Sequence, residues 1–179
     1  EVIDHATLAQ VAEFAARGID AAELARQALL AGLYWNEAWI AVETTGGWGI
    51  PVVKDHLWRR FRYRALYRRP APDSTSDAPR ATLGWMTSRR TRPQMEAGLE
   101  ELLRQGEDGI RSKALARELL TYMRHPDGKT GPAPGEFSDR LMAYMIAQQV
   151  AREKLLRRPR RRLEGGASYL RPRNPITGY

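Results

Sequence analysis

Apolar and polar residues alternate at two different periods in the first third of the chain. Between residues 24 and 35 the apolar positions recur at helical spacing, at Leu24, Ala28, Ala31 and Trp35. Asp20 followed by Glu23 is typical of a capping box, so this pattern predicts a helix that begins near residue 21. Upstream, Val2 and Ile3 predict a short strand, and the loose alternation over residues 7–17 predicts a second strand after a turn.

A nearly continuous apolar run covers residues 39–42 and ends at Glu43. Such a short run predicts a strand that is covered on both faces, as in a parallel sheet. The glycines at 46, 47 and 49 then turn the chain, and they lack the spacing of a nucleotide-phosphate loop. Residues 52–61 predict a helix with Pro51 in its first turn, and residues 65–67 predict another short strand.

The second half of the chain reads mainly as helices. Apolar residues form one stripe after Pro93, at Met95, Leu99, Leu102 and Leu103. Ser112 is placed to cap a further helix that carries Leu115 and Leu119. Residues 122–137 predict a loop or a hairpin, and Ser138 precedes a last long helix that ends near residue 156. The succession of strands and helices indicates a mixed α/β fold, although the strand order does not follow from it.

Two segments are polar or basic without a hydrophobic period. Residues 70–79 are rich in Pro, Ser and Asp and predict a loop within the domain. Residues 157–179 open with a run of arginines and predict a flexible basic tail that binds anions without sequence preference. We therefore expect one domain over residues 1–156, followed by this tail.

Charge and composition narrow the class of partner. The 179 residues include 29 Lys and Arg against 21 Asp and Glu, a formal net charge of +8, which favours polyanions such as nucleic acid. The chain has no cysteine, and its three histidines lack the spacing of a zinc site. No apolar run approaches the roughly 20 residues that span a bilayer, so we expect no membrane partner. The first residue is Glu, which is compatible with a chain that begins inside a longer product.

Two carboxylates are placed for metal chemistry. Glu43 ends the predicted buried strand, at the edge where open α/β sheets bind ligands. Asp139 begins the last helix, in line with the core stripe of Met142, Ile146 and Val150. Carboxylate oxygens at one sheet edge suit hard divalent cations. The plainer interpretation is that Asp139 complements the helix dipole and that Glu43 is solvated.

Weaker candidates surround this pair. Glu136 is either an auxiliary metal ligand or, more simply, a loop residue. Five cations are candidates for contacts with DNA phosphates, with a solvated surface as the alternative: Lys54, Arg89, Arg90, Arg92 and Lys129. Trp58 and Trp85 are better explained as core residues than as platforms for stacked bases.

The order of several short motifs resembles the nuclease domain of the large terminase subunit of tailed bacteriophages. The matching stretches are QVAE (10–13), YWNEAWIAVE (34–43), GIPVV (49–53), LYRR (66–69), GWMTS (84–88), residues 110–119 and FSDRLMA (137–143). Each stretch is weakly specific, and their order and spacing carry the resemblance over nearly the whole chain to about residue 155.

The resemblance implies an RNase H-like mixed sheet flanked by helices, and a metal-dependent endonuclease that cuts concatemeric double-stranded DNA during viral DNA packaging. In that family three acids hold two Mg²⁺ or Mn²⁺ ions, and Glu43 and Asp139 fall at the second and third acidic positions. The first acid belongs to an opening strand upstream of Val2, so we expect this chain to lack that strand and to be inactive alone; Asp4 does not match it. Phe137 and Ser138 stand where many members carry His and Asp.

The same resemblance implies a place in the cell and a set of partners. It implies a packaging motor in the host cytoplasm that is absent from the mature virion, with the portal and the small terminase subunit as partners of the full-length protein. Two cations about 4 Å apart would activate a water and stabilise the departing 3′ oxygen. Three other classes stay open: a basic DNA-binding or assembly module without catalysis, another RNase H-like nuclease such as a junction resolvase, and a plain structural domain.

Overall fold

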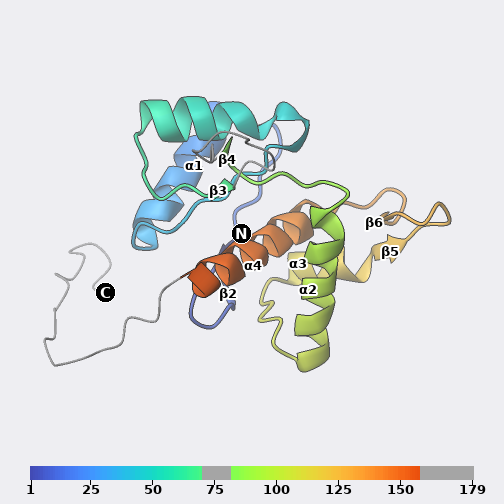
Figure 1. Ribbon diagram of the computed structural model, residues 1–179. Coiled ribbons are helices and arrows are strands. Elements are labelled where there is room, and N and C mark those ends of the chain that lie inside the picture. The colour runs from blue at the N-terminus through green and yellow to red at the C-terminus, as the bar shows by residue number, and fades with distance from the viewer. Residues whose placement is uncertain (70–81, 158–179) are drawn as a thin grey trace, which may run out of the picture.

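The computed structural model describes residues 1–69 and 82–157, with side chains as far as Glu153. Within these residues it contains helices and three small antiparallel sheets, which confirms the mixed α/β prediction (Figure 1). The predicted polar loop at 70–79 and the predicted tail beyond Arg157 lie outside the described residues. No helix of the described part has the length and apolarity needed to cross a membrane.

The amino terminus forms a hairpin of β1 (Val2–Ile3) and β2 (Gln10–Ala12). Asp4 closes the turn, because its Oδ1 accepts the backbone N–H groups of Ala6 (2.6 Å) and Thr7 (3.2 Å). The prediction of a strand over residues 7–17 was too long at both ends. Residues 13–17 are exposed and have no pairing in the sheet, so the alternation there reflects no buried face.

Helix α1 (Ala21–Tyr34) begins where the sequence predicted. The Asp20 side chain accepts the Glu23 N–H at 2.8 Å, which is the first half of a capping box. The second half is absent, since the Glu23 carboxylate accepts hydrogen bonds from Arg26 and Gln27. The pairing with Arg26 lowers the pKa of Glu23 to about 2.

A short turn of helix, η1 (Thr45–Gly47), leads into η2 (Pro51–Arg60), which packs along α1. η2 confirms the predicted helix, but its hydrogen bonding is wider than expected. The Phe61 N–H closes it by donating to the His56 carbonyl five residues earlier, at 2.8 Å, so the helix has a π-type pitch. Its buried residues, Val52, Val53 and Leu57, face a cluster that α1 completes through Ala25.

Two short strands, β3 (Arg68–Arg69) and β4 (Thr82–Leu83), pair antiparallel beside η2. The chain then enters α2 (Thr91–Gln105) and α3 (Lys113–Leu120). As predicted, Ser112 caps α3, its hydroxyl accepting the N–H groups of Ala114 and Leu115 at 3.1 Å. The predicted loop or hairpin is a hairpin, formed by β5 (Tyr122–Arg124) and β6 (Thr130–Pro132).

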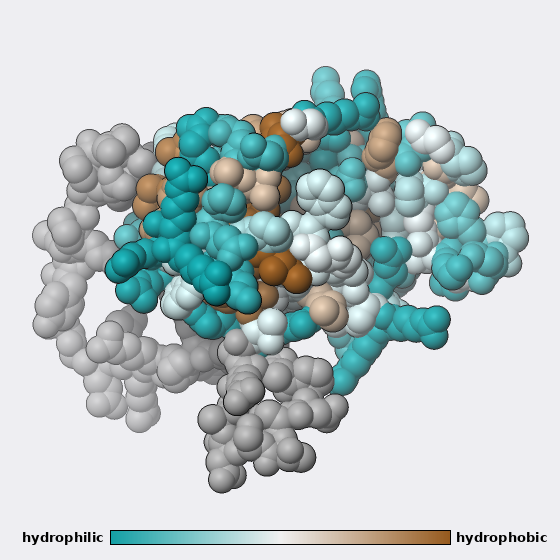
Figure 2. Space-filling model, turned by 90° about the horizontal axis from the view of Figure 1, so that it is seen from above, coloured by the Kyte–Doolittle hydropathy of each residue, from teal (hydrophilic) through white to brown (hydrophobic). Residues whose placement is uncertain are grey.

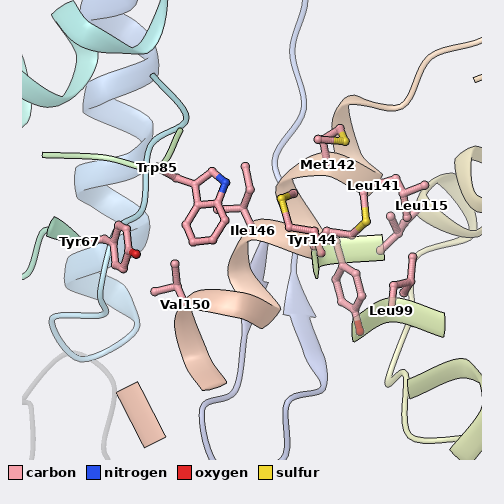
Figure 3. Packing of buried hydrophobic residues seen from close by; sticks show 11 residues of the cluster. Tyr67, Trp85, Leu99, Leu115, Leu141, Met142, Tyr144, Ile146 and Val150 are labelled. Atoms are coloured by element: carbon pink, nitrogen blue, oxygen red, sulfur yellow. The ribbon is translucent and has the colours of Figure 1, made fainter. Parts of the chain in front are cut away.

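The last helix, α4 (Asp139–Arg157), lies at the centre of the second half of the fold. Figure 1 shows α2, α3 and β1–β2 around α4, and α1 and η2 together in the upper part of the view. The cluster around α4 contains Met95, Leu99, Leu115 and Tyr144. Figure 3 shows its other side, where Ile146 and Val150 meet Trp85 and Tyr67.

The predicted buried strand at residues 39–42 is not a strand in the structure: the segment makes only isolated parallel bridges, at Ile40 and Glu43, and residues 40–43 are half-buried between these two clusters. Ile40 and Val42 pack against the α1–η2 cluster, whereas Ala41 packs against the α4 cluster. Successive side chains therefore cover opposite faces, as predicted for residues 40–42. The prediction was wrong for Trp39, which is 54% exposed because the pairing begins only at Ile40.

Candidate metal centre

The backbone of residues 40–44 is held by parallel contacts along one edge. The Ile40 N–H donates to the Ala65 carbonyl (2.8 Å), and the Ile40 carbonyl accepts the Tyr67 N–H (2.9 Å). Further along, the Trp85 N–H donates to the Val42 carbonyl at 2.8 Å, and the Thr44 N–H returns to the Trp85 carbonyl at 2.7 Å. Glu43 lies between these last two bonds and forms an isolated parallel bridge with Trp85.

Glycines lie close to the backbone at the Glu43 end of this segment. A Cβ on Gly49 would lie 1.7 Å from the Glu43 carbonyl oxygen, so only glycine allows the chain to cross there. Gly84 has φ of +86° and sits against the Val42 carbonyl on the paired side. Gly46 and Gly47, with φ of +71° and +89°, make the turn itself. The glycine loop therefore fixes the backbone behind Glu43, as the sequence predicted.

Threonine side chains strengthen the same junction. The Thr44 hydroxyl donates to the Trp85 carbonyl at 2.9 Å and is buried. The Thr45 hydroxyl accepts the Thr87 N–H at 2.8 Å, so two successive residues after Glu43 are bonded to the segment that carries Trp85. Glu43 itself is half-buried, with a backbone that is fixed on both sides.

Asp139 is the first residue of α4, as predicted, and its side chain is exposed. The residues that lie one, two and three turns further along the same face of α4 are buried: Met142, Ile146 and Val150 are 9%, 3% and 5% exposed. Asp139 thus continues the line of the core-facing residues but lies beyond the end of the core. An acidic residue in this turn also complements the positive end of the helix dipole.

A residue that the sequence interpretation missed holds the start of α4. Glu118 of α3 is 7% exposed, and its Oε2 accepts the Leu141 N–H at 3.0 Å while its Oε1 accepts Arg140 Nη1 at 2.9 Å. The first bond caps the helix from a neighbouring element, and the second raises the pKa of Arg140. The available signal was spacing, because Glu118 follows Leu115 by three residues and so falls on the apolar side of α3.

Trp85 connects the two candidate carboxylates through the core. Its backbone pairs with Glu43, and its ring is 6% exposed in the cluster that contains Met142, one turn after Asp139 (Figure 3). Glu43 thus follows an extended segment paired with Trp85, and Asp139 begins α4 one turn before Met142, which belongs to the same cluster as Trp85. In the described parts of the chain neither carboxylate is paired with a Lys or Arg, and no three His, Asp or Glu side chains are grouped to hold a metal.

Two buried polar atoms in the segment that pairs with residues 43–45 lack partners among the described residues. Trp85 Nε1 and Thr87 Oγ1 have no hydrogen bond with any described residue. Most buried polar groups in folded proteins are satisfied, so such atoms mark places where a polar ligand or water fits. Both belong to residues 84–88, which bracket the end of the extended segment at Glu43.

The other predicted candidates are distributed over three places. Glu136 is exposed, in a turn closed by its N–H bond to the Ala133 carbonyl at 2.9 Å, which fits the loop interpretation. Arg89 and Arg90 are exposed just before α2. Lys54 is exposed on η2, whereas the other four predicted cations lie at residue 89 or later, outside η2.

Arg92 and Lys129 are brought together by the hairpin. Arg92 Nη1 donates to the Thr130 carbonyl at 3.0 Å, which joins α2 to β6. Lys129 pairs with Asp127 at 2.9 Å, and both groups are exposed, so this pair adds little stability. Arg92 therefore has a structural role that the sequence did not reveal, whereas Arg89 and Arg90 keep exposed side chains.

No protein-family model matches the chain, and no curated protein matches it.

Proposed function

We propose that the chain is the RNase H-like nuclease domain of a viral DNA-packaging terminase, a metal-dependent endonuclease for double-stranded DNA. The observation that carries the proposal is that Glu43 is bridged to Trp85 at the end of an extended segment, while Asp139 begins α4 one turn before Met142, which shares a core cluster with Trp85. The order of motifs from residue 10 to residue 143 supports the same family.

The donor set suits Mg²⁺ or Mn²⁺ better than zinc. Glu43 and Asp139 supply hard oxygen ligands, and the chain has no cysteine. Mg²⁺ keeps several waters and is commonly bound by one or two protein carboxylates together with substrate phosphates. When bound, the cations supply charge stabilisation for phosphodiester hydrolysis.

The residues of the chain fix the backbone at the two carboxylates and contact the phosphates of the DNA. The bonds of Val42 and Thr44 to Trp85 fix the backbone on either side of Glu43, and Gly49 closes the turn behind it. Glu118 fixes the first turn of α4 and with it Asp139. A fixed backbone at both residues limits the positions that the two carboxylates can reach. Exposed cations such as Arg89 and Arg90 hold the phosphate backbone without reading bases.

Isosteric substitution of the two carboxylates tests the proposal. Glu43→Gln and Asp139→Asn each remove one anionic ligand without changing shape, and we expect each to lower Mn²⁺-dependent nicking of a supercoiled plasmid by at least 100-fold. Glu100→Gln is the matched control, because Glu100 is an exposed carboxylate of α2 with no ion pair among the described residues. The substitutions are made in a version extended upstream that carries the first acidic strand, and the chain without this extension, which we expect to be inactive alone, is assayed beside it.

Calorimetric titration with Mn²⁺ gives a second measurement that does not require cutting. We expect weak binding by the protein alone and tighter binding with a short duplex present, since phosphates complete the metal's ligands. Nicking at wild-type rate by clean preparations of both Glu43→Gln and Asp139→Asn would refute the site.

A second candidate function has one observation in its favour. No group of three acidic or histidine ligands occurs among residues 1–69 and 82–157 up to Glu153. That finding favours a basic DNA-binding or assembly module in which catalysis is absent. Duplex binding that weakens steeply with salt, combined with no Mn²⁺ binding at millimolar concentration with or without DNA, would select the module over the nuclease.

A further inference from the structure

An arginine-rich segment surrounds the end of η2, and none of its arginines was among the predicted DNA contacts. Between positions 54 and 69 the chain carries seven cations: Lys54, Arg59, Arg60, Arg62, Arg64, Arg68 and Arg69. The same stretch contains one acid, Asp55, which pairs with Arg59 at 3.0 Å. Most of the positive charge of this segment is therefore not balanced within it.

Buried neighbours hold the exposed arginines in place. Tyr63 is 6% exposed and donates its hydroxyl hydrogen bond to the Ala38 carbonyl at 2.6 Å, which anchors the chain between Arg62 and Arg64. Leu66 and Tyr67 are also buried, and Arg68 follows them on the surface. The arginines thus project from a backbone that is fixed by packing, unlike charges on a loose loop.

Trp58 organises two of these side chains. The guanidinium carbons of Arg68 and Arg64 lie 4.5 and 5.7 Å from the centroid of its ring, and Arg60 lies 5.5 Å from the ring of Phe61. A guanidinium stacked on an aromatic face keeps its N–H edge available for oxygen ligands. Among the described residues, Arg60, Arg62, Arg64 and Arg68 form no ion pair with a carboxylate. We name these four residues the η2 arginine surface.

The η2 arginine surface shares no residue with the candidate metal centre, although the backbone of Arg68 pairs with Gly84, next to the Trp85 that pairs with Glu43. Arg64 immediately precedes Ala65, which pairs with Ile40 at the beginning of the 40–44 segment, whereas Glu43 lies near its end. η2 is the uppermost element in Figure 1, and in the view from above Figure 2 shows hydrophilic residues over much of this face. The surface can therefore contact a ligand without occupying the carboxylate site.

We propose that the η2 arginine surface is a second binding site for the phosphate backbone of duplex DNA. The stacked guanidinium groups of Arg60, Arg64 and Arg68 have planar N–H edges whose geometry matches phosphate oxygens, and they form no ion pair among the described residues. The choice of duplex DNA among polyanions rests on the proposed function. Contacts of this kind give affinity and register on the duplex but no sequence preference.

The test measures binding of a fluorescent duplex by anisotropy in EDTA, so that cutting plays no part. Arg62→Gln, Arg64→Gln and Arg68→Gln are combined in one variant. The matched control combines Arg17→Gln, Arg111→Gln and Arg117→Gln, three exposed arginines that also form no ion pair within the described residues. Both variants lose the same charge, and circular dichroism checks that each is folded.

We expect the first variant to bind at least 10-fold more weakly at about 0.1 M salt. The association constant K for DNA falls as salt rises. We expect the magnitude of the slope of log K against log salt concentration to decrease by about 0.9 for each DNA phosphate that the variant no longer neutralises. The control is expected to change affinity less than 3-fold. Equal losses of affinity in the two variants would overturn the proposal, as would a larger loss for an RNA duplex or for anionic vesicles than for DNA.

A lysine variant and the carboxylate variants complete the design. One variant combines Arg62→Lys, Arg64→Lys and Arg68→Lys, which keeps the charge. We expect its affinity for the duplex to lie between that of the wild type and that of the glutamine variant. Wild-type affinity of this lysine variant would overturn the role of stacked arginines. Glu43→Gln is expected to retain the wild-type salt slope. If Glu43→Gln abolishes cutting and the arginine variants bind DNA like the wild type, only the η2 arginine surface is rejected. If Glu43→Gln still cuts and the arginine variants bind DNA more weakly, the nuclease is rejected and the surface is kept.

Discussion

The junction between α3 and α4 makes Glu118 the most informative position for a stability measurement. Its buried carboxylate accepts one hydrogen bond from the Leu141 N–H and one from Arg140. Arg140 also lies 3.6 Å from Glu13, so it keeps an acidic neighbour when Glu118 is removed. Glu118→Ala leaves the Leu141 N–H at the start of α4 without its acceptor. It leaves Arg140 with only the longer contact to Glu13.

The size of the effect follows from these contacts. Loss of a helix cap costs typically about 1 kcal/mol. A hydrogen bond to a charged group contributes about 1.5–3 kcal/mol, which we reduce to about 1 because the Arg140 side chain is 34% exposed. Loss of the one buried methylene group that Glu118→Ala removes, Cγ, adds about 0.8 kcal/mol. We therefore expect Glu118→Ala to lower the free energy of unfolding by about 3 kcal/mol, and Glu118→Gln, which keeps one acceptor and the packing, by about 1.5.

Urea unfolding followed by tryptophan fluorescence measures both variants. The control is Glu100→Ala on the exposed side of α2, for which we expect less than about 0.5 kcal/mol. For a chain of this size 3 kcal/mol corresponds to a fall in Tm of about 6–12 °C. A double-mutant cycle with Arg140→Ala should give a coupling energy near 1 kcal/mol. A loss below 1 kcal/mol for Glu118→Ala would refute the cap from α3.

Two further predictions concern the glycine crossing and the buried tyrosines. Gly49→Ala places a Cβ against the Glu43 carbonyl and should cost about 3 kcal/mol, whereas Gly46→Ala meets open space and should cost only about 1 for its positive φ; equal effects in urea unfolding would contradict the crossing. Burial raises the pKa of Tyr63 and of Tyr144 to about 12, above about 10 in an unfolded chain. The unfolded state then loses protons first, so stability is intact below pH 10 and falls by up to about 1.4 kcal/mol per pH unit for each tyrosine between pH 10 and 12. Tyr63→Phe should flatten this decline in urea unfolding at pH 8–11.5, and Tyr34→Phe, whose ring is 60% exposed, should not; identical slopes would be evidence against the buried hydroxyl.

The parts of the fold that the sequence predicted well are governed by local interactions. Asp20 and Ser112 each bond to amides two or three residues ahead, so the signal and the structure lie in the same turn. The stripes of α2 and α4 follow largely from helical period, and Met95 and Ile146 are buried; Leu103, which was predicted in the α2 stripe, is 39% exposed. Boundaries of helices were therefore predictable within about two residues.

The failures depend on partners that are distant in the chain. Trp39 looked like part of the buried strand, but burial begins only where residue 65 pairs with Ile40. The π-type pitch of η2 has no counterpart in the apolar pattern that predicted a helix there. Glu118 was passed over because a charged residue on a short helix is usually solvated, and its partners at 140 and 141 lie more than 20 residues away.

The candidate site shows the same division. Glu43 and Asp139 were found from predicted element ends; Asp139 does begin α4, whereas Glu43 follows an extended segment that makes isolated bridges and is not a strand. Their common link to the Trp85 cluster could not be predicted, since it depends on the pairing of residue 43 with residue 85. Likewise the joint position of Arg64 and Arg68 over Trp58 requires the turn at Tyr63.

The proposed site has a thermodynamic consequence that joins its parts. If Glu43 and Asp139 bind cations together with DNA phosphates, the metal and the duplex must bind cooperatively, because each supplies ligands that the other needs. Linkage is reciprocal, so the factor by which Mn²⁺ tightens DNA binding equals the factor by which DNA tightens Mn²⁺ binding. The η2 arginine surface lies outside this cycle, since it contacts phosphates without the metal. Its removal should weaken DNA binding equally with and without Mn²⁺, whereas Asp139→Asn should abolish the difference between the two conditions.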